Sequence, residues 1–333
     1  MYDDLDPSEF EDTAKSVVET CANTDAVAAR AALLAEAGLL SVAAPDAIGG
    51  LGLPLDFAVP ICAASGAGLL GFPIVEALLL SKALADVDAD LAGKIASGEK
   101  VATVAWRGVA EDEVVGCAPM ALDADVVLIF RADGSAVLAP TGNAVKPEPT
   151  GAFDVDAPDA LIRVSGPLEG PVLDPAVVTD IFADAKILRS AYIKGAAAEC
   201  LSIAAAYAQE RVQFGRPLSA NQVLRHRMSR DALSVETLKN GLIRALDTEG
   251  AEAEMARDAL WLDAARTGPA VAESAIQVFG GMGFTWDVPL HRYLRQMRAQ
   301  ASYGAALDKF DSFAANLVNT TDNSWYGDLP NGL

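Results

Sequence analysis

The chain has 333 residues, of which 52% are hydrophobic and 21% are charged, so it is long enough for two or three packed domains and too apolar to be disordered. Forty-six acidic residues against 25 basic ones give a net charge of −21. Such a charge opposes binding to phosphate backbones and to anionic lipid surfaces. We therefore expect neither a nucleic-acid partner nor a membrane partner.

Cysteine and histidine usage makes a metal site unexpected. The four cysteines lie tens of residues apart and form no CxxC pair, and the chain has only two histidines. The chain opens with the acidic run MYDDLDPSEFEDT, where a signal peptide would be basic and then apolar. No later segment offers about 18 uninterrupted apolar residues. We expect a cytoplasmic protein.

Hydrophobic periodicity divides the chain into three regions. Residues 1–99 repeat apolar positions at helical spacing, which predicts an α-helical N-terminal domain. Residues 100–178 contain short β-branched runs, VATVAW at 101–106 and VVLIF at 126–130, which predict a reduced middle β domain. The Asp133-Gly134 pair predicts a hairpin turn there.

The third region, 179–333, is again helical. An Ala-rich stretch at 186–212 predicts a first long helix, and Ser219-x-x-Gln222 matches a capping box before a second. Long antiparallel helices predict a four-helix bundle. The predicted fold class is therefore α+β, with helices, a small sheet and then a bundle.

Two segments carry positive charge without any acid. Residues 211–230 contain five arginines, and residues 288–307 contain Arg292, Arg295 and Arg298. Arginines in an acidic protein indicate either a phosphate-binding site or a solvated bundle face that pairs with acids elsewhere. Charge alone leaves both interpretations open.

Three motifs resemble those of the acyl-CoA dehydrogenase family. ERVQFGRPLSANQ at 210–222 and IQVFGGMGFTWDVPLHRYLRQMR at 276–298 resemble blocks of its C-terminal domain, and LLAEAGLLSVAAPDAIGGLG at 33–52 is similar to an N-terminal element. The resemblance implies the same three-region layout, with FAD and acyl-CoA at the junction. It also implies that a glutamate removes the α proton of the thioester while the β hydride passes to the flavin, and that an electron-transferring flavoprotein reoxidises it.

The resemblance implies that FAD is shared between subunits. In the family, the Arg and Phe of RxxFG and the Gln-x-x-Gly-Gly turn hold the pyrophosphate and adenosine end of a flavin seated in the neighbouring subunit. The matching positions here are Arg211, Phe214, Gln277, Gly280 and Gly281. All five match the family pattern.

Two other family motifs are missing. The TEPxAGSD-like stretch that cradles the flavin ring is replaced by VATVAWRGVAEDE, which puts Arg107 and Gly108 where the Thr-Glu pair is expected. The resemblance therefore implies poorer support for a flavin ring in the cleft of this chain itself.

The catalytic glutamate is also missing. Gly304 stands at its usual position, and the position that some relatives use instead falls at about Ala185. Glycine and alanine have no titratable group, so neither can act as the general base. Asp308, about one helical turn after Gly304, and Asp184 are the nearest carboxylates that could replace it.

The combination resembles the non-catalytic subunit type of heteromeric α2β2 acyl-CoA dehydrogenases from bacterial steroid side-chain degradation. The first hypothesis is a subunit that completes the FAD site of a catalytic partner acting on a bulky acyl-CoA. The second is a self-sufficient homo-oligomeric dehydrogenase whose base is displaced to Asp308 or Asp184. The third is a catalytically dead binding protein.

Overall fold

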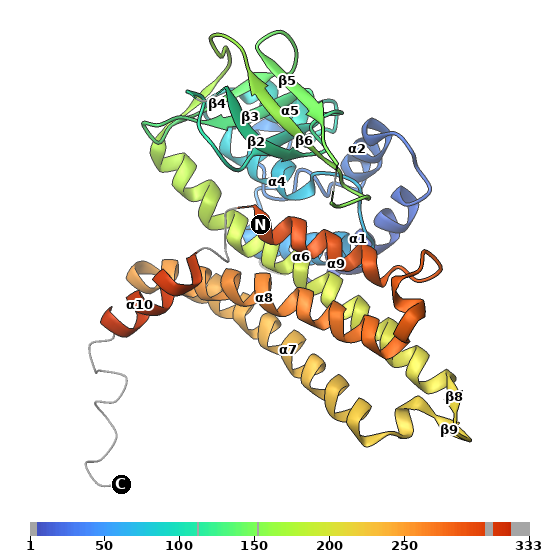
Figure 1. The fold of residues 1–333 in the computed structure, drawn as a ribbon. Helices are drawn as coiled ribbons and strands as arrows, with labels where there is room; N and C mark the ends of the chain where they lie inside the picture. Colours follow the sequence, from blue (N-terminus) through green and yellow to red (C-terminus); the bar gives the residue numbers. More distant parts are fainter. Residues whose placement is uncertain (1–4, 112, 152, 304–308, 321–333) are drawn as a thin grey trace, which may run out of the picture.

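The computed structural model describes residues 5–111, 113–151, 153–303 and 309–320, and its helices and strands follow the predicted order (Figure 1). The N-terminal helices pack beside a pair of small sheets, and long helices extend away from both. This arrangement confirms the predicted α+β class. Within the described residues, no helix is both long enough and apolar enough to cross a bilayer. The helices before the first strand are α1 (Glu9–Cys21), α2 (Val27–Glu36), α3 (Ala58–Ala67), α4 (Ile74–Ala83) and α5 (Ala89–Ala96).

The strands form two facing sheets. The first sheet has the order β1-β3-β4-β7, in which β1 and β3 are parallel, and the second has the order β2-β6-β5. The strands are β1 (Ala102–Ala105), β2 (Val114–Pro119), β3 (Val126–Phe130), β4 (Ala136–Pro140), β5 (Val145–Pro149), β6 (Asp159–Val164) and β7 (Val172–Leu173).

Strand β3 explains why the VVLIF run has no polar face. Val127 and Ile129 belong to the cluster between the two sheets, whereas Leu128 and Phe130 join the core that faces the helices. A strand covered on both sides needs apolar residues at every position. The hairpin predicted at Asp133-Gly134 is confirmed, because Gly134 adopts φ +85° between paired strands β3 and β4.

Long helices make up the C-terminal region (Figure 1). They are α6 (Pro175–Glu210), α7 (Gln222–Asp247), α8 (Ala253–Phe279), α9 (Leu290–Ser302) and α10 (Phe310–Thr320). The first of them begins eleven residues before the predicted 186–212 range, because Pro175 occupies a first-turn position where its missing N–H costs nothing. The predicted capping box is wrong. Ser219 lies in a 3-10 turn, and Asn221 precedes the first residue of α7.

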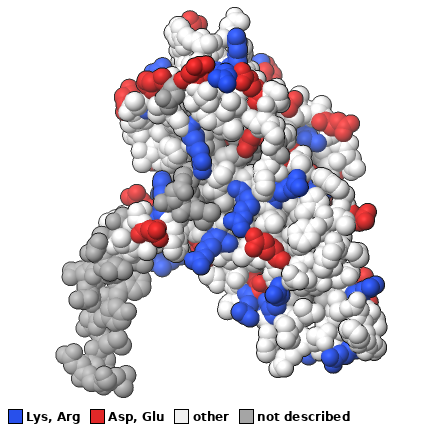
Figure 2. All heavy atoms as spheres, in the orientation of Figure 1, with Lys and Arg blue, Asp and Glu red and all other residues white. Residues whose placement is uncertain are grey.

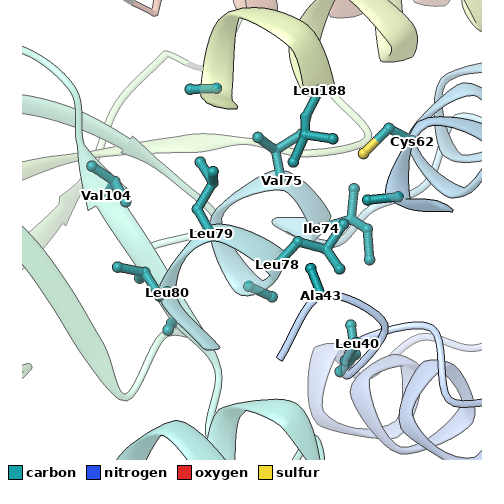
Figure 3. Packing of buried hydrophobic residues seen from close by; sticks show 14 of the residues in the cluster. Leu40, Ala43, Cys62, Ile74, Val75, Leu78, Leu79, Leu80, Val104 and Leu188 are labelled. Carbon is teal, nitrogen blue, oxygen red and sulfur yellow. The ribbon is translucent and has the colours of Figure 1, made fainter. Parts of the chain in front are cut away.

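Helix α4 lies at the centre of the core. Eight of its ten residues are buried, and Figure 3 shows its leucines between Val104 of β1, Leu188 of α6 and the segment around Leu40. A helix that is apolar on all sides is stable only when neighbours cover every face. Here α4 joins the N-terminal helices, the first sheet and the bundle in one core.

The one acid of α4, Glu76, is part of a buried polar cluster. The Arg189 guanidinium of α6 donates to Glu76 at 2.5 Å and to Gln300 of α9, and Glu76 also accepts the indole N–H of Trp106 at 2.9 Å. The guanidinium carbon lies 4.5 Å from the ring centre of Trp106 and equally far from that of Tyr303. Both members of the ion pair are about 2% exposed, so the cluster joins four separate segments in a dry environment.

Further polar contacts attach the second sheet to α9. Arg292 donates to both carboxylate oxygens of Asp156, and the Tyr303 hydroxyl donates to Asp159. Beside them, the Asp154 carboxylate is 3% exposed and accepts backbone N–H groups of Asp156 and Ala157. Burial outweighs these hydrogen bonds and raises the pKa of Asp154 to about 7.

We predict that the buried ion pair shows strong coupling. Glu76→Leu leaves the Arg189 guanidinium buried without a carboxylate and should lower the free energy of unfolding by about 3–5 kcal/mol. Adding Arg189→Met should recover part of that loss, because no buried charge then remains unpaired. Urea unfolding of wild type, both single variants and the double variant measures this. Additive losses from the two substitutions would contradict the coupling.

Asp154 should make stability fall as the pH rises. The folded protein keeps this proton up to about pH 7, whereas the unfolded chain releases it near 3.8, so stability is lost between these values. The free energy of unfolding of Asp154→Asn, measured relative to wild type, should therefore be higher at pH 8 than at pH 4 by up to about 4 kcal/mol. Urea unfolding at both pH values measures the gain.

A matched control is Asp133→Asn. Hydrogen bonds from Ser135 lower the pKa of the exposed Asp133 carboxylate, so its removal should not produce a gain at pH 8. If Asp154→Asn changes stability equally at both pH values, Asp154 does not titrate as described.

Candidate functional site

A two-stranded hairpin follows the end of α6 and points into solvent (Figure 1). Its strands are β8 (Val212–Gln213) and β9 (Arg216–Pro217). The tip residues Phe214 and Gly215 have φ values of +52° and +77°, as a type I′ turn requires. This conformation costs a phenylalanine about 1 kcal/mol, and the Phe214 side chain is fully exposed at 102%. An exposed aromatic ring held in this way contributes nothing to the core of this chain.

The arginines around the hairpin divide into two kinds. Arg216 donates to the Asn221 side chain at 2.8 Å and Arg225 donates to the Ser219 carbonyl at 2.6 Å, so these two stabilise the turn before α7. Arg211 is exposed, and its side chain makes no ion pair with any described residue. Its guanidinium is therefore available to an anion outside the chain.

Gln277, Gly280 and Gly281 lie at the C-terminal end of α8. Gly280 ends the helix with φ +64° and ψ −138°, a conformation that is open to glycine and rarely to other residues. Gly281 is exposed, and a Cβ atom there would have no atom within 4 Å. The backbone is therefore open to close approach by a ligand.

A ring contact brings the two groups of residues to the same end of the bundle. Tyr207, in the last turn of α6, stacks on Phe279, the last residue of α8, with 3.9 Å between ring centres. The hairpin with Arg211 and Phe214 and the turn with Gly280 thus extend from neighbouring helix ends. No contact joins the two groups directly among the described side chains.

Gln277 also lines a groove of about 550 Å³ between α7 and α8. Arg227 and Arg230 line it from α7, and Asp231 accepts the Ser274 hydroxyl at 2.6 Å within it. Figure 2 shows basic side chains across the middle of this face and on the bundle, with acidic side chains among them and others over the sheets. The acid-free segment 211–230 indicated a basic surface in this region. It did not single out Arg227 or Arg230, because only the helix geometry places them beside Gln277.

The donors at this end of the bundle suit a phosphate-containing group. Guanidinium groups form paired, charge-assisted hydrogen bonds with phosphate oxygens, and exposed glycine backbone can donate N–H groups nearby. Arg211, Arg227, Arg230 and Gln277 are all at least partly exposed. The residues present therefore fit a phosphate-containing group such as the ADP end of FAD.

A second site lies where the sheets meet the bundle. This cavity has a volume of about 230 Å³ and is bordered by Trp106 and Tyr303, the residues just before Arg107 and Gly304. It therefore lies beside the positions at which the resemblance expects the flavin cradle and the base. Its lining residues are Trp106, Phe182, Ala185, Lys186, Arg189, Asp258, Trp261, Leu262, Tyr303, Lys309, Ser312 and Phe313.

The residues that replace the flavin cradle have structural roles. Arg107 donates twice to the Ser302 carbonyl, at 2.8 and 3.1 Å, and so caps the end of α9. Gly108 adopts φ +81°, and a Cβ atom there would lie 2.9 Å from the Cα of Val115. With Arg189 held between two aromatic rings beside them, these residues do not fit a flavin ring.

No free carboxylate appears among the described residues that line this cavity. Asp258 forms an ion pair with Lys186. Ala185, the alternative base position, lines the cavity, but Asp184 pairs with Lys82 of α4 at 2.8 Å and does not line it. Gly304 and Asp308 lie outside the described residues. Among the described residues, the cavity thus shows no general base.

Comparison with known proteins finds relatives in sequence and in fold. Residues 176–304 match the family model for the acyl-CoA dehydrogenase C-terminal domain. The acyl-CoA dehydrogenase FadE34 of Mycobacterium tuberculosis is 29% identical over 295 residues, which cover 82% of this chain. The chain spans 40% of the length of that relative.

Two solved structures show the same fold. The ChsE4-ChsE5 complex from Mycobacterium tuberculosis aligns with a TM-score of 0.82 at 22% identity, covering 94% of this chain and 97% of the other. The Tcur3481-Tcur3483 steroid ACAD G363A variant aligns with a TM-score of 0.79 at 23% identity, covering 94% and 99%. Residues 176–304 thus match the acyl-CoA dehydrogenase C-terminal domain, and the chain shares the fold of these solved structures.

Proposed function

We propose that this chain is the non-catalytic subunit of a heteromeric, FAD-dependent acyl-CoA dehydrogenase. It binds the ADP end of a flavin whose ring is seated in a catalytic partner subunit, and that partner supplies the base. The observation that carries the proposal is the exposed hairpin, on which the side chains of Arg211 and Phe214 face solvent without a partner among the described residues. A site that binds only the ADP end of a flavin requires a second chain to bind the flavin ring.

Electrostatics supports this division between the subunits. At one end of the bundle, Arg211, Arg227 and Arg230 offer positive charge to a pyrophosphate. At the sheet junction, Arg189 and Arg107 are committed to contacts within the chain. The surface that fits FAD therefore faces outward, while the cleft of this chain itself offers no cradle for the ring.

The reaction assigned to the assembly is α,β-dehydrogenation of an acyl-CoA. FAD accepts a hydride when bound, and the partner's base removes the α proton. This chain neutralises and orients the nucleotide end through Arg211, Gln277 and the backbone at Gly280 and Gly281. It contributes to turnover by fixing the position of the cofactor and not by proton transfer.

The assembly and the substrate follow from the same analogy. The structures with the same fold include a two-component complex and an assembly described as a steroid ACAD. We assign the chain to an α2β2 heterotetramer in the cytoplasm, acting on a bulky acyl-CoA such as a steroid side-chain thioester. An electron-transferring flavoprotein is the proposed electron acceptor.

Co-expression tests this role. The partner to use is an acyl-CoA dehydrogenase chain that keeps the Thr-Glu motif and the glutamate base. The purified complex should hold one FAD per pair of unlike chains and oxidise acyl-CoA, while this chain alone should hold little FAD. If this chain alone purifies with one FAD per copy and turns over acyl-CoA, the proposal is wrong.

Substitutions on the hairpin sharpen the test. Arg211→Gln removes a charge-assisted contact with the pyrophosphate and should weaken FAD binding to the complex about tenfold. Phe214→Ala should also weaken it without destabilising this chain, because the ring is fully exposed. Flavin fluorescence during dilution of the complex measures both. Arg131→Gln, next to the β3–β4 turn, is the matched control and should leave FAD affinity unchanged.

A further inference from the structure

Exposed apolar side chains are concentrated at the end of the bundle that carries the hairpin. Among the described residues, 16 large hydrophobic side chains are exposed, and six of them come from two short stretches, 212–223 and 282–286. Tyr207 stacks on Phe279 just before these stretches, so both lie at the same end (Figure 1). A concentrated apolar group marks a site of interaction, whereas single exposed residues do not. The six residues, here called the bundle-end surface, are Val212, Phe214, Val223, Met282, Phe284 and Trp286.

The turn after α8 is held in a fixed conformation. Gly283 is buried, and a Cβ atom there would lie 2.7 Å from a carbonyl oxygen of α8, so the turn packs closely on that helix. Thr285 donates its backbone N–H and its hydroxyl to the Met282 carbonyl, at 3.0 and 2.8 Å. The Trp286 ring meets the buried His291 ring edge to face, with 4.6 Å between centres. Rings that are already fixed lose little conformational entropy when a partner covers them.

The exposed apolar area is large enough for a stable protein contact. Phe214, Phe284 and Trp286 are 102%, 71% and 69% exposed. At roughly 200 Å² for a whole aromatic side chain, these three rings alone expose about 500 Å². A standard interface covers about 800 Å² on each partner, and somewhat more than half of that area is apolar. The bundle-end surface therefore supplies the apolar part of such an interface.

The charge around this surface favours a different chain over a second copy of this one. Residues 274–286 contain no charged side chain, and residues 211–230 contain five arginines and no acid. Two copies meeting through the same surface would bring the five arginines of one against the five of the other. Like charges facing each other across an interface are unfavourable. A partner with apolar residues opposite the rings and acids opposite the arginines avoids this repulsion.

We infer that the bundle-end surface docks directly on the catalytic partner subunit, with Phe284 and Trp286 as its apolar anchors. This inference rests on the proposed function for the existence of that partner. It goes further, because it makes the contact between the two proteins, and not the shared flavin, the main source of their affinity. Phe214 borders the proposed FAD site and contributes to both.

The experiment separates assembly from cofactor binding. The chain is co-expressed with the same catalytic partner, assembly is measured by light scattering at decreasing concentration, and flavin content by absorbance. Phe284→Ser and Trp286→Ser should each weaken assembly by about tenfold or more, because buried aromatic anchors dominate interface affinity. The flavin content of the complex that remains should not change. Arg211→Gln should do the reverse, lowering flavin content while the two chains stay assembled.

A matched control is Leu122→Ser, between β2 and β3. Leu122 is 52% exposed and lines the outer surface of the sheets, so this variant loses a comparable apolar side chain away from the bundle end. It should leave assembly unchanged. Because Phe284 is 71% exposed, Phe284→Ser should unfold in urea like the wild type, which shows that any loss of assembly is not a loss of folding.

Three results would overturn the inference. Assembly that persists unchanged in both Phe284→Ser and Trp286→Ser would remove the rings from the interface. Dissociation of the chains in Arg211→Gln in step with the loss of flavin would make the flavin the main link. Self-association of this chain alone that Phe284→Ser abolishes would make the occupant a second copy.

These results are distinguishable from a failure of the proposed function. A wild-type complex that holds FAD but is insensitive to the two serine substitutions refutes the docking inference alone. A wild-type complex that assembles through the rings but holds no FAD refutes the proposed cofactor role alone.

Discussion

The buried pair of Arg189 and Glu76 is the interaction on which the arrangement of the regions depends. It joins α6 to α4, and through Trp106, Tyr303 and Gln300 it also reaches β1 and α9. A dry guanidinium is tolerable only when a carboxylate, hydrogen-bond acceptors and ring faces surround it. These partners come from α4, from the residue after β1 and from the end of α9, so the pair is satisfied only when all three are assembled on α6.

This assembly uses the space beside the expected catalytic positions for internal contacts. Arg107 caps α9 and Arg189 lies between two rings, so the groups nearest the cleft stabilise the chain. The groups free to bind a second molecule, such as Arg211 and Phe214, lie just beyond the C-terminal end of α6, whereas Arg189 lies near the middle of that helix. Internal stability and recognition are therefore assigned to different parts of one 36-residue helix and the hairpin after it.

Sequence patterns predicted the parts of the fold that depend on local signals. The VVLIF run and the Asp133-Gly134 turn predicted β3 and its hairpin correctly. A strand buried on both faces requires apolar residues throughout, and a turn with positive φ favours glycine. The Glu76 and Arg189 pairing was not predicted, since 113 residues separate the partners and neither belongs to a motif. The capping box failed because its pattern lies within a 3-10 turn, where tertiary contacts decide the helix start. The five cofactor positions came from family motifs and stay predictions.

The central position of α4 has a consequence for how the molecule unfolds. One continuous apolar cluster takes residues from the N-terminal helices, from the first sheet and from α6, α7 and α8. The segments that pack on α4 cannot detach without exposing its leucines to water. These segments should therefore unfold together, and a protease that cuts between them would release fragments that are unable to stay folded.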